Sequence, residues 1–245
     1  KKQQEVDELK KLETYRREFL ADISHELKTP LFAAQGFVHT LLDGAMDDEN
    51  VKEKFLKKAA KSLDGLNILV QDLLLLSQIE TGELKMQFVS FDIQKLCEEV
   101  VEQLEHKAEK RDVKLRLKSF YGVIVKGDKM RIYQVIVNLV DNAIKYGGNS
   151  VEISIERNKD QVEIAVSDNG VGIQQEHLKR IFDRFYRIEK SRNRDKGGTG
   201  LGLSIVKNVI DAHNSKIQVQ SKIGKGTTFA FKLQVGVLAD VVNDD

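Results

Sequence analysis

The sequence predicts an α+β protein built in two parts, a helical hairpin followed by an α/β layer. The first part is indicated by apolar residues that recur at alternating spacings of three and four, as in a packed helical seam. The second part is indicated by short segments in which apolar and polar residues alternate, with amphipathic helices between them. A length of 245 residues gives each part enough chain to bury its own core.

The first part begins with residues 1–18, which are charged with sparse apolar positions, a pattern typical of a helical lead-in or coiled-coil linker. Residues 19–82 are predicted to form the hairpin, because the seam spacing occurs on both sides of the polar connection 43–50. One hairpin has too little core to stand alone. Pairing with a second copy into a four-helix bundle is therefore expected.

A second domain is predicted over residues 86–235, and the tail 236–245 is expected to belong to neither part. Five segments have the alternation of half-buried strands: 113–118, 150–156, 161–168, 216–221 and 227–233. Three segments carry the apolar stripe of a helix: 92–110, 128–146 and 202–213. Together they predict a sheet with one face covered by helices.

The composition is that of an ordinary globular chain. Hydrophobic residues make up 41% and charged residues 31%, and a net charge of +1 gives no strong field to attract nucleic acid or a membrane surface. The single cysteine, Cys97, is predicted to be a buried small hydrophobe in a reducing compartment. No apolar run is long enough to span a membrane, so a soluble piece is expected, which could belong to a longer membrane protein.

The stretch FLADISHELKTP, residues 19–30, contains a histidine and the only proline of the chain. The seam spacing places His25 in water, where an imidazole is largely neutral at cellular pH. Glu26 can accept the N–H of one ring nitrogen and so raise the nucleophilicity of the other. Pro30 removes a helical hydrogen bond to Glu26, so a bend or loosened turn is predicted there. The alternative is a surface histidine in a helix with an accidental kink.

Polar residues in the helix 128–146 suit a magnesium-bound triphosphate. Asn138, Asn142 and Lys145 share one face of this helix. A carboxamide oxygen can ligate a hard cation, and the ammonium can meet phosphate charge. A solvated polar face is the alternative interpretation.

The strand 161–168 ends in Asp168, on the same side as its apolar residues. A buried carboxylate is costly unless it is paired, and an adenine amino group would be such a partner. Gly170 and Gly172 follow, where the absence of side chains would let a base lie against the backbone. An ordinary turn is the commoner meaning of Asp-Asn-Gly.

The glycine-rich stretch 197–207 opens a helix whose free N–H groups can hold phosphates, although it is not a P-loop because no GK[ST] follows. The segment before it is polar and basic and is predicted to be a mobile lid that orders on a polyanion. Its cationic residues are Arg187, Lys190, Arg192, Arg194 and Lys196.

These stretches carry a resemblance to one family. FLADISHELKTPL resembles the phospho-acceptor box of bacterial two-component sensor histidine kinases. NLVDNAIKY, DNGVGI, RIFDRFYR, GTGLGL and GKGTTF occur in the order of the N, G1, F and G2 boxes and the closing strand of the histidine-kinase ATP domain, the Bergerat fold shared with gyrase, Hsp90 and MutL. The resemblance covers residues 19–233, and LFAAQGFVHTLLDG is similar to phosphate-regulon type sensors.

The resemblance implies a homodimeric kinase core in which MgATP phosphorylates His25 and the phosphoryl group passes to an aspartate in the receiver domain of a response regulator. Glu26 would be the acid–base partner of His25, Thr29 would position the water that dephosphorylates the regulator, and Arg187 would meet the γ-phosphate. It also implies the cytoplasmic portion of a membrane-anchored inner-membrane sensor with no nucleic acid partner.

For the cofactors ATP and Mg²⁺, the resemblance implies that Asn142 ligates the metal with Asn138 close by. Lys145 and Tyr146 would contact phosphates or the lid, and Asp168 would receive the adenine amino group. The aromatic residues expected to hold the lid are Phe182, Phe185 and Tyr186. The other expected cofactor-binding residues are Gly170, Gly172, Gly198, Thr199, Gly200, Leu201, Gly202, Leu203 and Thr227.

Two other function classes remain open at this point. One is a clamping ATPase like gyrase or Hsp90, against which the acceptor-histidine box argues. The other is a scaffold that dimerises and binds regulators without turnover, which would need damaged boxes.

Overall fold

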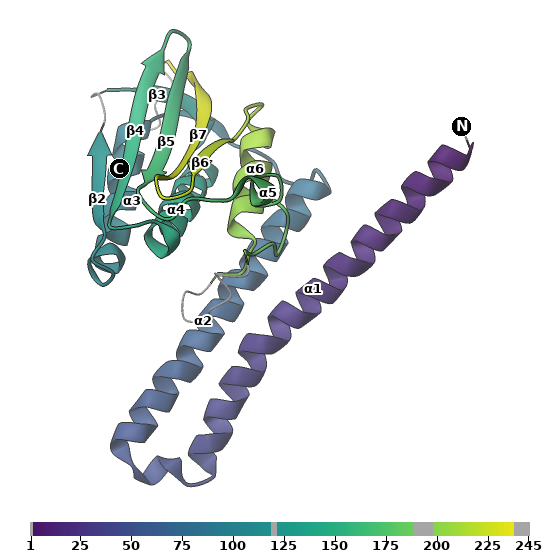
Figure 1. Cartoon of the computed structure of the whole chain (residues 1–245), viewed down its shortest axis with the longest axis vertical. Helices are drawn as coiled ribbons and strands as arrows, with labels where there is room; N and C mark the ends of the chain where they lie inside the picture. Colours follow the sequence, from purple (N-terminus) through teal and green to yellow (C-terminus); the bar gives the residue numbers. More distant parts are fainter. Residues whose placement is uncertain (1, 119–121, 189–197, 238–245) are drawn as a thin grey trace. The chain divides into compact units, whose positions relative to one another are not determined.

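A computed structural model describes residues 2–118, 122–188 and 198–237 of the chain (Figure 1). The chain divides into two compact units, Lys1–Leu74 and Leu75–Asp245. The predicted α+β fold class is confirmed, with a helical region followed by an α/β sheet. Within the described residues, no helix carries an apolar stretch that would cross a membrane.

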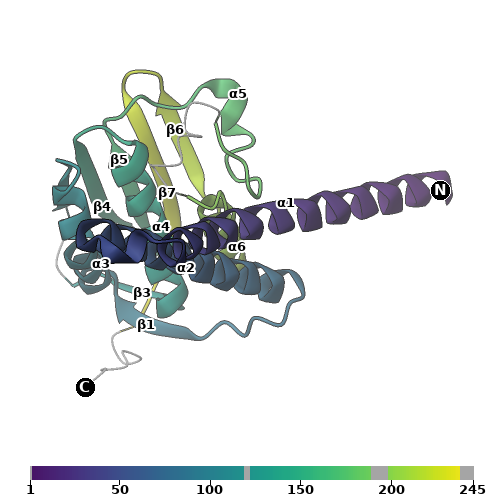
Figure 2. The ribbon, with the colours of Figure 1, turned by 90° about the horizontal axis from the view of Figure 1, so that it is seen from below.

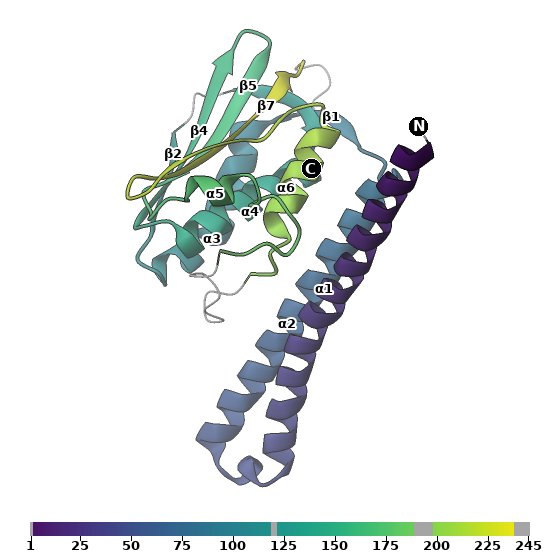
Figure 3. The same ribbon diagram turned by 45° about the vertical axis from the view of Figure 1, so that its right-hand side comes forward.

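The first unit is a hairpin of two long helices, α1 (Lys2–Leu42) and α2 (Glu49–Glu80), joined through a short 3-10 turn, η1 (Ala45–Asp47) (Figure 3). The two helices lie close together near this turn and diverge toward the N-terminus of α1 (Figure 1). Its contacts include the rings of Phe37 and Phe55, whose centroids lie 5.7 Å apart. The charged residues 2–18 continue into the hairpin as one helix.

The proline does not interrupt α1, which runs through Pro30 to Leu42. The hydroxyl of Thr29 donates to the carbonyl oxygen of His25 at 3.2 Å. The backbone bond that Pro30 removes is therefore tolerated inside a continuous helix.

The hairpin leaves much of its apolar surface uncovered. Ala34, Leu41, Ala59 and Leu69 are buried, but many large apolar residues are at least 39% exposed. Those in residues 19–74 are Leu20, Leu31, Phe32, Val38, Leu42, Met46, Leu56, Leu63, Ile68, Val70 and Leu74. A stripe of this length is typical of an interface rather than of a free surface.

The second unit is built on one mixed sheet. Its strands are β1 (Phe88–Asp92), β2 (Lys114–Lys118), β3 (Ile124–Asp128), β4 (Ser150–Asn158), β5 (Gln161–Asp168), β6 (Gln218–Lys222) and β7 (Gly226–Val235). Their order is β1-β3-β7-β5-β4-β2, with β6 paired to β7. Only the β2–β4 pairing is parallel among the pairings of the described residues.

Three helices cover one face of this sheet, as predicted (Figures 1 and 3). They are α3 (Ile93–Glu109), α4 (Lys129–Tyr146) and α6 (Gly202–Ala212); a fourth, short helix is α5 (Gln175–Leu178). The apolar residues of β5, Val162, Ile164 and Val166, are buried beneath them. Figure 2 shows the same layers from below.

Cys97 of α3 is fully buried, as predicted, and burial raises the pKa of its thiol to about 12.

The sequence patterns did not reveal β1 and β3, which pair with each other at one end of the sheet.

The tail was expected to begin at residue 236, but the first two of its residues pack on the second unit. The amide of Gly236 donates to Ile124 at 3.0 Å and that of Val237 to the hydroxyl of Ser90 at 3.3 Å, so these two residues belong to the second unit. The rest of the predicted tail, 238–245, lies outside the described residues.

A histidine joins the end of α6 to the start of α4. The ring of His213 accepts the N–H of Asp128 at Nε2, 2.9 Å away, and donates from Nδ1 to the carbonyl of Val209 at 2.8 Å. These two bonds require the neutral tautomer with hydrogen on Nδ1. Burial lowers the pKa of His213, although its bond to Val209 and the charge of Asp128 oppose this effect.

We expect the stability of the second unit to fall as the pH decreases from about 7 to about 5. The unfolded chain takes up a proton at His213 near its ordinary pKa of about 6.5, whereas the folded ring does so only at lower pH, so acid favours unfolding. Urea denaturation at several pH values measures this dependence. It should be weaker in His213→Gln and unchanged in His106→Gln, whose side chain is 77% exposed in the wild type. Equal pH profiles for wild type and His213→Gln would contradict the assignment.

Candidate functional site

His25 lies on α1 with its side chain 77% exposed, which agrees with its predicted place opposite the seam. Its Nδ1 lies 3.4 Å from Oε1 of the neighbouring Glu26, whose side chain is 32% exposed. With hydrogen on Nδ1, the ring donates to this carboxylate and leaves the lone pair of Nε2 directed away from it. The structure thus brings the predicted acceptor histidine into contact with its predicted acid–base partner.

The second cluster of predicted site residues lies where β5 ends. Asp168 is half-buried and accepts the N–H of Gly170 at 2.8 Å. Burial raises the pKa of this carboxyl group, and the backbone N–H groups of Gly170 and Thr227 partly offset the shift. Thr227 is the register partner of Asp168 on β7 and is buried. A carboxylate with so little solvent gains from a further hydrogen-bond donor.

Glycines enclose Asp168 on several sides. A Cβ atom on Gly147 would lie 2.6 Å from the Cβ of Asp168, and one on Gly226 would lie 1.9 Å from its carbonyl oxygen. A Cβ on Gly170 would lie 2.6 Å from the Cα of Gly147. Three backbone segments, from the end of α4, the loop after β5 and the start of β7, thus approach one another closely around one carboxylate.

The packing gives a second reason for the two glycines after Asp168. They were expected to let a base lie against the backbone, and at both positions a Cβ would also meet the protein itself. A Cβ on Gly172 would lie 2.2 Å from the carbonyl oxygen of Lys222, and Gly172 also has φ of +74°. These glycines therefore serve the approach of the loop to its neighbours.

A serine that the sequence analysis did not single out ties this loop to Thr227. The hydroxyl of Ser221 accepts the N–H of Ile173 at 2.8 Å and lies 2.9 Å from the hydroxyl of Thr227. It also donates to the carbonyl of Gly226 at 3.1 Å. No sequence pattern around Ser221, Gly147 or Gly226 predicts these contacts, because the partners lie on other strands and loops that only the folded sheet brings together.

The polar face of α4 meets the glycine-rich segment before α6. Asn138 donates to the carbonyl of Gly202 at 3.5 Å, and Gly202 lies close enough that its Cβ would be 3.7 Å from that carboxamide. A Cβ on Gly198 would lie 3.5 Å from the Tyr146 hydroxyl and 4.0 Å from the Lys145 ammonium. The structure thus brings the predicted N-box and G2-box residues together.

The start of α6 exposes donors beside this face. Thr199 accepts the N–H of Leu201 at 3.2 Å, and Leu201 is fully buried. No side chain caps the helix at Leu201, so the first-turn amides of Gly202 and Leu203 have no intrahelical partners. Such a helix start favours a bound anion.

The F-box residues pack against the same glycine-rich segment. The N–H of Phe185 donates to the carbonyl of Gly200 at 3.0 Å, and a Cβ on Gly200 would lie 2.8 Å from the Cα of Phe185. Phe182 packs edge-on against Phe229, with ring centroids 6.2 Å apart. Tyr186 lies with its hydroxyl 2.7 Å from Nδ1 of His177.

Part of the predicted lid can be placed and part cannot. Arg187 is half-buried at the end of the F box. The other predicted cations of the lid, Lys190, Arg192, Arg194 and Lys196, lie outside the described residues.

The donors available for a metal ion are mainly carboxamides. No group of three or more His, Cys, Asp or Glu side chains that could hold a metal occurs among the described residues. Asn138 and Asn142 can each offer one oxygen. Mg²⁺ often keeps few protein ligands and takes the rest from water and phosphate, so these residues fit that ion only together with a phosphate ligand.

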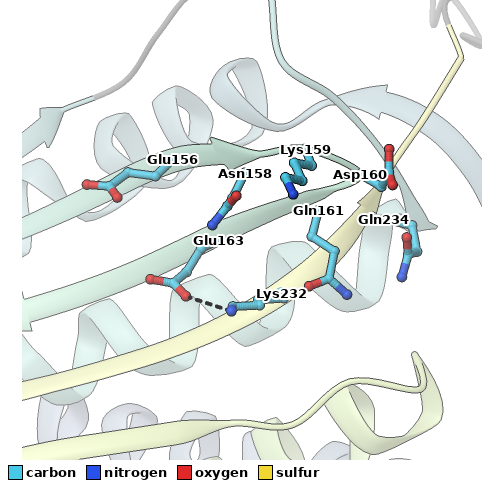
Figure 4. Close-up of a pocket in the computed structure, with 8 residues that line it drawn as sticks. All are labelled: Glu156, Asn158, Lys159, Asp160, Gln161, Glu163, Lys232 and Gln234. Carbon is cyan, nitrogen blue, oxygen red and sulfur yellow. Dashed lines mark ion pairs between the residues drawn. The ribbon is translucent and has the colours of Figure 1, made fainter.

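A polar hollow of about 480 Å³ lies elsewhere, on the face of the sheet opposite the helices (Figure 4). It contains an ion pair between Lys232 and Glu163 at 3.5 Å. Its lining residues are Glu156, Asn158, Lys159, Asp160, Gln161, Glu163, Lys232 and Gln234. None of the predicted site residues lines this hollow.

Two family models match the chain. The His Kinase A (phospho-acceptor) domain matches residues 15–82, and the histidine kinase-, DNA gyrase B- and HSP90-like ATPase matches residues 127–237. The first match contains His25, and the second contains Asp168 and the polar face of α4.

Curated relatives match over nearly the whole chain. The sensor histidine kinase WalK of Bacillus subtilis is 35% identical over 94% of this chain and 38% of its own length. The sensor-like histidine kinase SenX3 of Mycobacterium tuberculosis is 37% identical over 96% of this chain and 57% of its own length. The chain therefore spans between 38% and 57% of the length of these relatives.

Solved structures show the same similarity. The histidine kinase AdeS of Acinetobacter baumannii has a TM-score of 0.70 and 29% identity over 87% of this chain and 98% of its own. The catalytic domain of histidine kinase ThkA has a TM-score of 0.54 and 31% identity over 61% of this chain and 99% of its own. ThkA in complex with the response regulator TrrA has a TM-score of 0.63 and 27% identity over 89% of this chain and 61% of its own.

We expect Gly226→Ala to destabilise the second unit strongly, because its Cβ would overlap the carbonyl of Asp168 and its φ is +95°. Gly224→Ala is the matched control, since Gly224 lies in the same hairpin with φ of +74° but has open space at its Cβ. The control should lose about 1 kcal/mol through backbone strain alone and Gly226→Ala at least about 2 kcal/mol more. Urea denaturation measures both; similar losses would show that the close approach is not a constraint.

Proposed function

The chain belongs to the histidine kinases, and on this premise we propose that it phosphorylates His25 from ATP and passes the phosphoryl group to an aspartate of a response regulator. The observation that carries the proposal is the exposed imidazole whose Nδ1 faces Glu26 at 3.4 Å. This geometry places a nucleophilic ring nitrogen on a surface that a second protein or domain can reach.

The chemistry at the histidine follows from that pair. The lone pair of Nε2 attacks the γ-phosphorus of ATP. The bond between this phosphorus and the β–γ bridging oxygen breaks, and ADP leaves with the electron pair of that bond. The new N–P bond would leave the imidazole cationic. Glu26 takes the Nδ1 proton or holds it in a charge-assisted hydrogen bond, which stabilises the positive ring as it forms.

The adenine is proposed to bind at the end of β5. Asp168 has one oxygen bonded to the N–H of Gly170 and can accept the exocyclic amino group with the other. Burial favours this bond, because the carboxylate otherwise lacks solvent. The buried hydroxyl of Thr227, held by Ser221, lies on the neighbouring strand position and can complete the edge of the base.

The phosphates are proposed to lie between α4 and the start of α6. Lys145 would meet phosphate charge, and the free amides of Gly202 and Leu203 would donate to phosphate oxygens. Asn142, with Asn138 close by, would hold Mg²⁺, which supplies charge neutralisation to the triphosphate when bound. Tyr146, whose hydroxyl would lie 3.5 Å from a Cβ on Gly198, and Arg187 at the end of the F box would contact the phosphates or the lid.

The active form is proposed to be a homodimer that forms through the hairpin, residues 19–82, beside the ATP domain, residues 86–235. The exposed apolar stripe on α1 and α2 supports this, since a second hairpin would cover it in a four-helix bundle. We further propose that the chain is the cytoplasmic portion of a membrane-anchored bacterial sensor, with residues 1–18 as the helical input.

A response regulator is the proposed phosphoryl acceptor. ThkA, which this chain resembles in structure, has been solved with the response regulator TrrA. In this chain Thr29 lies one turn after His25 on the same side of α1, with its hydroxyl bonded to the His25 carbonyl. Thr29 is therefore suited to position the water that dephosphorylates the regulator.

Incubation of the full chain with Mg²⁺ and γ-labelled ATP tests the kinase. The wild type should carry an acid-labile, alkali-stable label, and His25→Gln should carry none while still binding ATP. Asp168→Asn should lose labelling because its ATP affinity falls at least about tenfold, the loss expected for a charge-assisted hydrogen bond. Label retained by His25→Gln would sink the acceptor assignment, and ATP hydrolysis without any label would favour a clamping ATPase.

Thr29→Ala separates the two activities of the hairpin. Autophosphorylation should stay within about twofold of wild type, because the hydroxyl takes no part in the attack of Nε2. Dephosphorylation of the regulator should slow at least about tenfold, as expected when a water-positioning group is removed. Thr29→Ser is the control that keeps the hydroxyl. Equal losses of both activities in Thr29→Ala would contradict this role.

A further inference from the structure

A cluster of three charges lies beside the polar face of α4. Oδ2 of Asp141 lies 2.7 Å from the ammonium of Lys145, one turn further along the same helix. Its other oxygen, Oδ1, accepts from the ammonium of Lys107, near the end of α3. One carboxylate is thus shared by two cations from two helices.

This cluster is partly removed from water. The side chains of Asp141 and Lys145 are 20% and 19% exposed, and that of Lys107 is 43% exposed. Burial raises the pKa of Asp141, but the charges and hydrogen bonds of Lys145 and Lys107 outweigh it, and the net pKa lies below its ordinary value. Asp141 is therefore a carboxylate, and the cluster has one positive charge in excess.

The cluster borders the proposed phosphate site. Asp141 precedes Asn142, the proposed metal ligand, and shares its helix face with Asn138 and Lys145. The ammonium of Lys145 would lie 4.0 Å from a Cβ on Gly198, at the glycine-rich segment. A triphosphate at this segment would therefore approach both the Lys145 ammonium and the Asp141 carboxylate.

We propose that Lys107 is a positioning residue for triphosphate binding, because it neutralises Asp141 and so leaves the charge of Lys145 available to phosphate. The inference rests on the proposed function. Without Lys107, Asp141 would hold Lys145 alone and cancel its charge, and the phosphates would face an ion pair with no excess charge. Lys107 acts through Asp141, since it bonds to the oxygen that Lys145 does not use.

The effect should scale with the charge of the ligand. Titration calorimetry on the full chain with Mg²⁺ at low salt gives the affinities for ATP, ADP and adenosine. In Lys107→Gln, ATP should bind about three- to tenfold more weakly, ADP less so, and adenosine within about twofold of wild type. The difference for ATP should shrink at higher ionic strength.

The double variant Lys107→Gln/Asp141→Asn distinguishes charge balance from other roles of Lys107. Removing the carboxylate together with its neutraliser leaves Lys145 with its full charge, so ATP affinity should return to within about twofold of wild type. A Lys107 that touched phosphate directly would leave the double variant as weak as the single one. That result would overturn the proposal.

Lys232→Gln is the matched control. It removes a lysine whose exposure, 41%, is close to the 43% of Lys107, from an ion pair with Glu163 on the face of the sheet opposite the helices (Figure 4). Its ATP affinity should equal that of wild type. A loss as large as that of Lys107→Gln would show that the effect depends on net charge alone and would overturn the positioning role.

The outcomes separate this inference from the proposed function. If wild type binds ATP no better than adenosine, the proposed phosphate site fails. If wild type prefers ATP and Lys107→Gln retains that preference, the phosphate site stands and the role of Lys107 fails. An equal loss for ATP and adenosine in Lys107→Gln would indicate only that Lys107 joins α3 to α4, and would also overturn the proposal.

Discussion

The close approach of three backbone segments around Asp168 is the constraint on which the second unit depends. Gly147, Gly170 and Gly226 belong to different segments, and each stands where a Cβ would meet another part of the chain. The same packing half-buries Asp168 and gives one of its oxygens a backbone donor. A carboxylate placed in this way is costly in isolation, so its surroundings favour a ligand with a hydrogen-bond donor. Fold and proposed recognition of the base thus share one set of contacts.

Helix α4 connects this constraint to the rest of the proposed site. Its first turn is capped by Asp128, whose own N–H donates to His213 at the end of α6. Its buried face fills the space beneath the sheet, and its polar face meets the glycine-rich segment. One helix thus contacts both the proposed adenine site, through Gly147 after its last turn, and the proposed phosphate site, through its polar face.

The sequence predicted the fold class, the long helices and five of the strands, because each has a clear apolar period. It did not predict β1 or β3. Phe88–Asp92 is short and runs directly into α3, so its period is lost, and Ile124–Asp128 contains a glycine and charges. Ser221 and Lys107 were missed for a different reason: their partners lie on other elements, and only pairing of β6 with β7 and packing of α3 on α4 bring them together. The glycines after Asp168 were noticed for their proposed contact with a base, whereas their close approach to Gly147 and Lys222 could be seen only in the folded chain.

The two units satisfy opposite requirements, and this explains their different surfaces. The second unit closes its core and exposes mainly polar groups, as a nucleotide-binding domain can do alone. The hairpin instead keeps large apolar seam residues such as Leu20 at 55% exposure, and places His25 on the same helix in water. If His25 receives and passes on a phosphoryl group, as proposed, a donor and then an acceptor must reach it, so its own chain cannot enclose it. A bundle formed with a second copy would provide the missing core along the seam while leaving His25 on its outer side.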